Sequence, residues 1–201
     1  MQQPQQITLH DQAYEFYPWN QLGEDIFELS KKILDSGQKF DRLIALAKGG
    51  LTFSRSLVDY LEIPDVSSIK IEFYGVVNTI NKTPIITQSL PVSIRNEKIL
   101  VFDDIVDKGE TMKLAKQYLS YHGAESVTTA CLISKPWSHF KPDFWARESE
   151  AWIIFPNEVR ETIAALSESW GHMGDSPEEI RSQLLNIGFS EKEVALFAQL
   201  K

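Results

Sequence analysis

The chain has 201 residues, of which 43% are hydrophobic and 24% charged, and its formal net charge is −8 at pH 7. These values are typical of a globular α/β domain with a small appendage, and the negative charge disfavours unspecific nucleic-acid binding. No apolar run approaches the roughly 20 residues that span a bilayer, and the first ten residues lack the regions of a secretory signal. The single cysteine, Cys131, excludes an intramolecular disulfide. We therefore expect a cytoplasmic enzyme or binding domain with neither a membrane nor a nucleic acid as partner.

The chain opens with a Gln-rich and then aromatic stretch over 1–18, which we expect to be an extended lead-in. A helix is predicted over 21–35, because Asn20 is suited to cap its start and Gly37 to end it. Its apolar residues recur at spacings of four, three and four: Leu22, Ile26, Leu29 and Ile33.

Strands and helices then alternate. Short apolar runs predict five strands, over 42–47, 68–73, 98–103, 127–133 and 151–155. Helical stretches follow the first of them, to about residue 60, and the third, to about residue 122. This alternation favours an α/β fold with a central, mostly parallel five-stranded sheet flanked by helices. The linker 74–97 is too long for a plain connection, which predicts a lid or a disordered segment.

A helical hairpin is predicted at the C-terminus. Ser176 and Pro177 form a strong helix start with acids in the first turn, Gly188 ends that helix, and Ser190 begins a second one with the capping-box pattern. We accordingly divide the chain into a main domain over 1–170 and a C-terminal helical hairpin over 171–201. The hairpin is too small to fold alone, so we expect it to dock on the main domain or on a partner.

The most informative segment is Ile99-Leu-Val-Phe-Asp-Asp-Ile-Val-Asp-Lys-Gly-Glu-Thr111, in which a strand runs into acids, a tight turn and a helix. Backbone N–H groups at such a helix start bind phosphate. Acids beside a phosphate site are useful when the ligand also carries hydroxyls, a metal ion or an abstractable proton, as a sugar phosphate does. The nucleotide-binding patterns G-x-x-x-x-G-K-[ST] and G-x-G-x-x-G are absent. The alternative is a solvated acidic turn that caps a helix. Such a turn would account for a single acid, but it accounts poorly for the Asp-Asp-x-x-Asp pattern at the end of an apolar strand.

This segment closely resembles the phosphoribosyl-pyrophosphate (PRPP) signature of type I phosphoribosyltransferases. Independently, Ala45-Leu-Ala-Lys-Gly-Gly50 resembles the family's pyrophosphate loop, in which the Ala47–Lys48 peptide bond would be cis. Leu132-Ile-Ser-Lys-Pro136 with Ala151-Trp-Ile153 is similar to the base-binding region of the 6-oxopurine branch, the xanthine-guanine and hypoxanthine-guanine enzymes. The resemblance covers about residues 16–160 and implies the family's Rossmann-like fold with a small hood.

The resemblance also implies roles for the matching residues. Asp103 and Asp104 would bind the ribose hydroxyls and orient Mg²⁺-pyrophosphate, in contact with the ion or through water. Asp107 would be the general base on the purine ring. The 5′-phosphate site would be Lys108, Gly109, Glu110 and Thr111. Lys108 departs from the family, which usually has Thr or Ser there.

Pyrophosphate would be bound by Ala47, Lys48 and Gly49. In the base site, Lys135 would donate to the 6-oxo group and Trp152 would stack on the base beside Ile153. Tyr74 falls near the tyrosine of the family's mobile loop and would be the lid residue, although the preceding residue, a serine in the family, is Phe73 here. Trp137 and Trp145 are interpreted as packing residues.

The function implied is purine salvage: transfer of the phosphoribosyl group from PRPP to guanine, xanthine or hypoxanthine with Mg²⁺, by a homodimer or homotetramer. A non-catalytic PRPP- or nucleotide-sensing regulator on the same fold is the alternative. The net charge and the short N-terminal lead argue against it, whereas Asp107 and Lys135 favour catalysis. An orotate or other pyrimidine enzyme fits the PRPP signature but not the base region.

Overall fold

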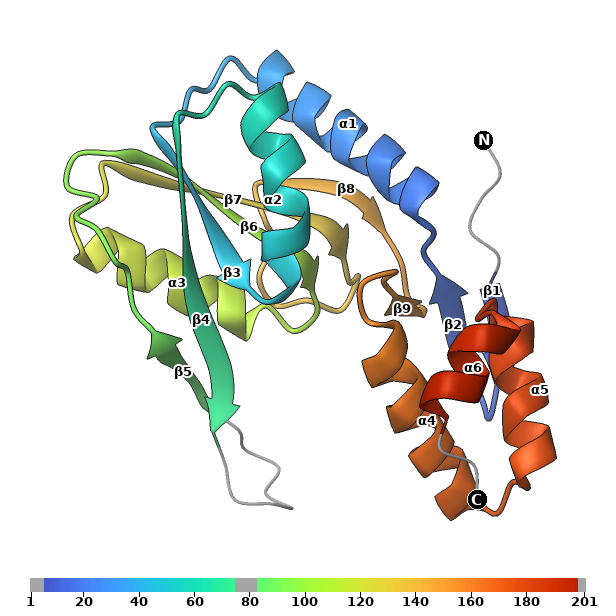
Figure 1. Cartoon of the computed structure of the whole chain (residues 1–201). Coiled ribbons are helices and arrows are strands. Elements are labelled where there is room, and N and C mark those ends of the chain that lie inside the picture. Colours follow the sequence, from blue (N-terminus) through green and yellow to red (C-terminus); the bar gives the residue numbers. More distant parts are fainter. Residues whose placement is uncertain (1–5, 75–82, 199–201) are drawn as a thin grey trace. The chain divides into compact units, whose positions relative to one another are not determined.

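The computed structural model describes residues 6–74 and 83–198 (Figure 1). The chain divides into two compact units, one formed by Gly23–Ser149 and the other by Met1–Leu22 with Glu150–Lys201. In the described parts, none of the helices combines the length and the apolar character needed to cross a membrane.

The larger unit is built on a six-stranded sheet in the order β5-β4-β3-β6-β7-β8. The strands are β3 (Arg42–Ala47), β4 (Asp65–Tyr74), β5 (Thr83–Gln88), β6 (Lys98–Val106), β7 (Ser126–Ser134) and β8 (Phe144–Glu148). All neighbours run parallel except β5, which is antiparallel to β4. The expected mostly parallel α/β sheet is therefore confirmed, with six strands instead of five.

Three helices accompany this sheet: α1 (Trp19–Asp35), α2 (Gly49–Tyr60) and α3 (Glu110–Tyr121). The boundary between the units falls within α1, whose predicted apolar stripe is buried along its length. Helix α2 connects β3 to β4, and α3 connects β6 to β7 in the opposite direction along the sheet. Because such crossovers are right-handed, α2 and α3 cover opposite faces. Each buried strand therefore has apolar side chains on both faces, which explains its continuous hydrophobic run.

The strand predicted over 151–155 does not belong to the central sheet. It forms β9 (Trp152–Ile154), which pairs in parallel with β2 (Gln12–Phe16) in a small sheet of order β1-β2-β9, where β1 is Gln6–Leu9. The outermost parallel strand of the central sheet is instead β8, which was not predicted. All but the last of its residues are intermediate in exposure, so its hydrophobic pattern is weak.

The linker 74–97 is not one long loop, which corrects the prediction of a lid or disordered segment over its whole length. Strand β5 runs back along β4, as Figure 1 shows. After β5, the Leu90 N–H donates to the Tyr118 hydroxyl at 3.2 Å, and Ile94 is buried. Within this linker, residues 75–82 lie outside the described residues, and the lid prediction for them stays a prediction.

The smaller unit contains α4 (Val159–Met173), α5 (Pro177–Ile187) and α6 (Glu191–Phe197) besides its three strands. Both helix starts of the predicted hairpin are confirmed, since Ser176 and Ser190 form complete capping boxes. Helix α4 was not predicted, although Ile163, Leu166 and Trp170 have helical spacing and are buried in it. The proposed domain boundary at residue 170 falls inside α4, and the extent of the main domain over 1–170 stays a prediction.

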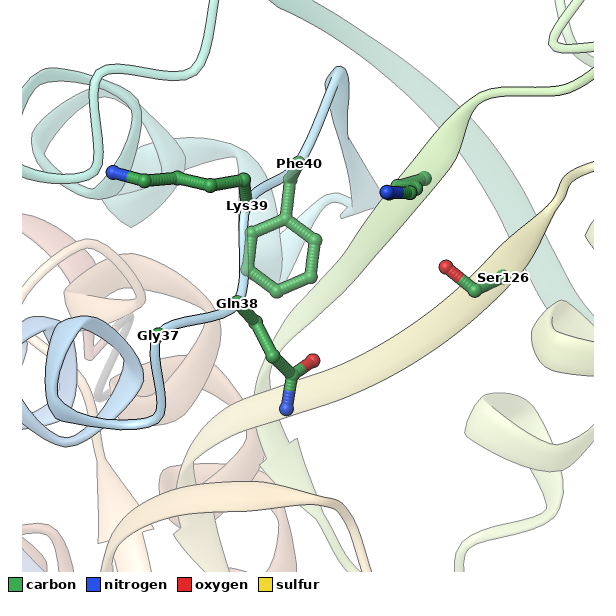
Figure 2. A pocket seen from close by; sticks show the side chains of 6 residues that line it. Gly37, Gln38, Lys39, Phe40 and Ser126 are labelled. Atoms are coloured by element: carbon green, nitrogen blue, oxygen red, sulfur yellow. The ribbon is translucent and has the colours of Figure 1, made fainter.

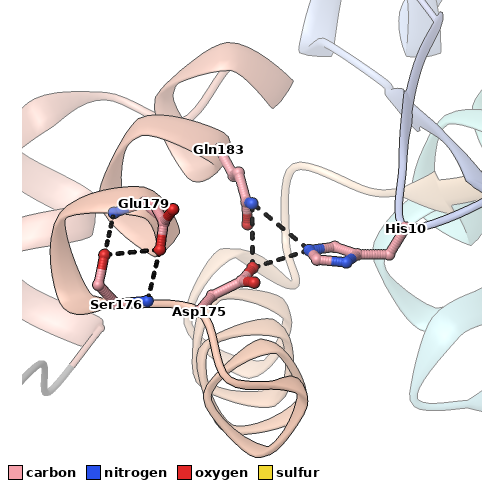
Figure 3. Close-up of polar contacts among 5 residues, drawn as sticks. All are labelled: His10, Asp175, Ser176, Glu179 and Gln183. Carbon is pink, nitrogen blue, oxygen red and sulfur yellow. Dashed lines mark hydrogen bonds and ion pairs between the residues drawn. The ribbon is translucent and has the colours of Figure 1, made fainter.

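Helices α4, α5 and α6 share one apolar core with the N-terminal strands. Its buried residues are Tyr14, Ile154, Ile163, Leu166, Trp170, Ile180, Leu184, Ile187, Phe189, Val194 and Ala198. Polar contacts reinforce it at the β1–β2 turn, where His10 Nε2 lies 2.8 Å from Asp175 Oδ2 (Figure 3). The same oxygen accepts a hydrogen bond from Gln183 Nε2 at 3.0 Å. The C-terminal hairpin therefore packs with the N-terminal strands as part of one unit.

Leu184→Ala is expected to lower the free energy of unfolding by about 3 kcal/mol, because it empties a fully buried site in this core. Urea denaturation followed by circular dichroism measures the change. Leu196→Ala is the matched control, since Leu196 is 71% exposed on α6 and its truncation should cost less than about 0.5 kcal/mol. Equal stabilities of the two variants would contradict the burial of α5.

Candidate active site

The predicted site residues of the larger unit gather where the order of strands reverses. From β3 the chain moves to β4 on one side and then returns to β6 on the other side of β3. In an open parallel sheet, ligands bind outside the carboxyl ends of the strands at such a switch point. Helices α2 and α3 also begin there, so their N-termini offer N–H groups and positive dipole ends to an anion.

The loop after β3 lies directly against the acids that end β6. The Ala47–Lys48 peptide bond is cis, as the sequence led us to expect. A Cβ atom at Gly49 would overlap the carboxylate of Asp104, and one at Gly50 would overlap the carbonyl oxygen of Phe102. Only glycine therefore permits this close approach. The lysine–glycine loop and the acidic pair form one continuous site.

Asp103 and Asp104 form a crowded acidic pair. Burial and the neighbouring carboxylate of Asp104 raise the pKa of Asp103 well above its usual range. Burial also raises the pKa of Asp104, although hydrogen bonds from the Asp103 side chain and the Ile105 backbone oppose the shift. The Asp104 N–H donates to Asp103 Oδ1 at 3.0 Å, and the Gly50 N–H also donates to Asp103. Cationic or hydroxyl ligands would relieve the repulsion between these carboxylates.

The acidic pair fits a Mg²⁺ ion that arrives with a diphosphate. Among the residues that the structure describes, no group of three or more Asp, Glu, His or Cys side chains forms a complete metal site. Mg²⁺ commonly binds one or two protein carboxylates and takes its other ligands from substrate phosphates and water. Asp103 and Asp104 could supply such a partial set.

The turn after β6 has the form of a phosphate site. Gly109 adopts a φ of +88°, and a Cβ there would overlap Phe140, so glycine is required on both counts. Gly109 is also the N-cap of α3, and in the described chain no side chain caps that helix start. Thr111 lies in the first helical turn, while Lys108 and Glu110 are exposed beside it. The backbone of the turn can thus accept a phosphate from solvent.

Asp107 has a neighbour that the sequence analysis did not assign to the site. Trp137 Nε1 donates to Asp107 Oδ1 at 2.7 Å, and Lys135 Nζ lies 5.3 Å from the centre of the Trp137 ring. Trp137 was interpreted as a packing residue, but 48% of it is exposed, and its indole N–H binds Asp107, the predicted general base. The sequence could have indicated this contact, because Trp137 lies two residues after Lys135, in the loop that follows β7, and β7 is the neighbour of β6.

The predicted base-site residues are divided between the two units. Lys135 is buried directly after β7, in the larger unit. Trp152 and Ile153 belong to β9 in the smaller unit, where Trp152 pairs with Tyr14 and is 56% exposed while Ile153 is buried. The exposed Trp152 ring could stack on a ligand, whereas the Ile153 side chain is buried, so that only its backbone could contact one. Tyr74 is exposed at the end of β4, and its lid role stays a prediction.

A surface pocket of about 310 Å³ lies apart from this site. Its lining residues are Gly37, Gln38, Lys39, Phe40, Lys98 and Ser126 (Figure 2). Lys98 and Ser126 are the first residues of β6 and β7, so the pocket is at the amino edge of the sheet. The predicted phosphate and acid residues follow the carboxyl ends of the strands, at the opposite edge.

Residues 13–162 match the family model of the phosphoribosyl transferase domain. The xanthine-guanine phosphoribosyltransferase of Nitratidesulfovibrio vulgaris is 28% identical over 168 residues, which cover 81% of this chain and 98% of that protein. The hypoxanthine-guanine phosphoribosyltransferase of Dictyostelium discoideum is 27% identical over 122 residues, covering 57% and 67%. The crystal structure of a purine phosphoribosyltransferase from Pyrococcus horikoshii is 29% identical with a TM-score of 0.65, covering 71% of this chain and 93% of that one.

Proposed function

The chain belongs to the phosphoribosyl transferase domain family, and we propose that it transfers the 5-phosphoribosyl group of PRPP to a 6-oxopurine base in purine salvage. The products are a nucleoside 5′-monophosphate and pyrophosphate. The observation that carries the proposal is the crowded pair of Asp103 and Asp104, which lies between two helix N-termini at the switch point. This arrangement suits a ligand with phosphates at both ends and hydroxyls between them.

In the proposed complex, PRPP lies across the carboxyl ends of β3 and β6. The 5′-phosphate binds the N–H groups of Lys108, Gly109, Glu110 and Thr111 at the start of α3 and the Thr111 hydroxyl. The pyrophosphate binds the loop Ala47–Gly49 and the start of α2. The ribose hydroxyls donate to Asp103 and Asp104, whose mutual repulsion then falls.

Cleavage of the bond between ribose C1 and pyrophosphate leaves positive charge on the sugar and negative charge on the leaving group. Lys48 and the start of α2 stabilise the departing pyrophosphate, because fixed charges and dipoles act strongly where charge develops. A Mg²⁺ ion held by Asp103 and Asp104 would supply further charge neutralisation at the pyrophosphate oxygens.

The purine nitrogen attacks C1 from the face opposite the leaving group, which inverts the configuration. Asp107 accepts the proton that the purine ring loses, since it is exposed directly after β6 and its Oδ2 is a second acceptor beside the Oδ1 bound by Trp137. Lys135 donates to the 6-oxo group of the base. Trp152 stacks on the base, beside the Ile153 backbone.

Tyr74 serves as the lid residue during turnover, because the oxocarbenium-like sugar must be protected from water. We also propose that the protein works in the cytoplasm, in keeping with its free, buried Cys131. We further propose that it assembles as a homodimer or homotetramer.

Lys108→Thr is expected to weaken PRPP binding by about fivefold at low ionic strength and by less at high salt, with kcat little changed. The exposed ammonium acts as a point charge near the 5′-phosphate, so water and ions screen it. Titration calorimetry with PRPP at two salt concentrations measures the change. Equal affinities of both proteins at low salt would show that Lys108 is only a solvated turn residue.

The test of the function is a screen for PRPP- and Mg²⁺-dependent turnover. Guanine, xanthine and hypoxanthine are offered in parallel with orotate and uracil, and both pyrophosphate and the nucleotide product are measured. Turnover of at least one 6-oxopurine and of neither pyrimidine is expected. Turnover of orotate alone would refute the purine assignment. PRPP binding without turnover of any base would favour the non-catalytic regulator.

A further inference from the structure

We propose that Trp137 is a positioning residue for Asp107, holding the carboxylate in the orientation from which it accepts the purine proton. The inference rests on the proposed function. It starts from a contact that joins two loops: Trp137 Nε1 donates to Asp107 Oδ1 at 2.7 Å. A hydrogen bond to an ionised carboxylate is stronger than one between neutral groups, so this contact can fix a side chain that is otherwise exposed.

The two loops are held in register by the sheet. Val106 and Ser134 are paired at the ends of β6 and β7, and the Lys135 N–H donates to the Val106 carbonyl at 2.9 Å. Asp107 and Trp137 therefore lie in two loops that begin at paired residues of neighbouring strands. A hydrogen bond at 3.2 Å from the His139 N–H to the Lys108 carbonyl joins the loops again beyond the indole.

Further along, the Trp137 loop packs closely on the phosphate turn. A Cβ at Gly109 would overlap Phe140 and would lie 2.9 Å from Ser138 Oγ. Ser138 Oγ in turn donates to the Phe140 carbonyl at 2.8 Å, which stiffens the loop. The backbone that carries the indole is thus fixed against the backbone that carries Asp107, and the geometry of their contact follows from the fold.

The indole also meets the residue proposed to bind the base. Lys135 Nζ lies 5.3 Å from the centre of the Trp137 ring, within the range of a cation–π interaction. One side chain therefore contacts both the proposed proton acceptor and the proposed donor to the 6-oxo group. Because only Oδ1 of Asp107 binds the indole, Oδ2 remains an acceptor for the substrate, and the contact orients the carboxylate without blocking it.

Trp137→Phe separates this role from simple packing, because phenylalanine keeps an aromatic face for Lys135 but lacks the N–H. We expect kcat to fall about tenfold while the KM for PRPP changes less than about twofold. In an Asp107→Asn background, the same replacement should have little further effect, since the proton acceptor that the indole orients is already lost even though the amide oxygen can still accept the indole N–H. Wild-type kcat in Trp137→Phe, with a loss only in Trp137→Leu, would show that the ring serves as packing and would overturn the proposal.

An independent readout is the indole N–H resonance of Trp137 in protein labelled with ¹⁵N-tryptophan. Its signal is the one that disappears in Trp137→Phe, and we expect it to move in Asp107→Asn while the signals of the other four tryptophans stay in place. An unchanged Trp137 signal would refute the contact. A wild-type protein that turns over no base would refute the proposed function, whereas an active wild type with an equally active Trp137→Phe variant would refute the positioning role alone.

Discussion

Asp107→Asn is expected to lower kcat by about 100-fold or more while the affinity for PRPP changes less than about threefold. General-base assistance contributes on this scale, and an amide cannot take up the purine proton. The asparagine side chain has the size of the aspartate and keeps an oxygen that can accept the Trp137 N–H, so the loop geometry is retained. Steady-state kinetics with the preferred purine, together with PRPP titration, measure the two effects separately.

The matched control for this variant is Glu125→Gln. Glu125 is an exposed acid just before β7, at the amino edge of the sheet, so its neutralisation changes the net charge without touching the site. Its kcat should stay near that of the wild type. If Asp107→Asn also turns over at the wild-type rate, the base assignment is wrong and proton loss must run through solvent or another group.

Asp103→Asn is expected to stabilise the free protein on the order of 1 kcal/mol at pH 7 and to lower kcat/KM for PRPP by about 100-fold or more. The amide removes one of two crowded carboxylates, a common gain where function has placed groups in an unfavourable setting. The same change removes a charged acceptor for the ribose hydroxyls and a ligand for Mg²⁺, and hydrogen bonds to charged groups are among the strongest.

The stability gain should depend on pH in a defined direction. The pKa of Asp103 is raised in the folded protein, so between the unfolded and folded pKa values the folded state binds more protons than the unfolded one. The wild type therefore loses stability as the pH rises through that interval, whereas the variant lacks this titration. The difference between the two proteins should be small near about pH 4, where an unfolded aspartate becomes protonated, and should grow as the pH rises from there towards the raised pKa of the folded protein.

Denaturant unfolding at several pH values tests this expectation, with Asp59→Asn as the control. Asp59 is an exposed partner of Arg55 on α2, and its replacement should change stability by less than about 0.5 kcal/mol at any pH. A variant Asp103→Asn that is less stable than the wild type at pH 7 would show that the acidic pair is held by favourable contacts rather than crowded.

Local sequence was sufficient for the elements whose pattern is strong. The buried parallel strands β3, β6 and β7 have continuous apolar runs, and the capping boxes at Ser176 and Ser190 mark their own helix starts. The segment 99–111 was singled out by its order of acids and a glycine before a helix, because phosphate binding at a helix start requires such a turn. The loop at Lys48 was identified through its resemblance to the family's pyrophosphate loop. That these two segments lie close together was predictable, because they end neighbouring parallel strands.

Tertiary structure alone decided which sheet a weak strand joins and which side chains meet. The local pattern of the run at 151–155 would suit a strand of either sheet, and only its pairing with β2 places it in the smaller unit. The central sheet is completed instead by β8, whose residues are mostly half-buried. The contact between Trp137 and Asp107 spans thirty positions and depends on the register of β6 and β7. Local patterns record burial and turn chemistry, whereas partners distant in sequence are chosen by strand pairing and by the packing of the whole core.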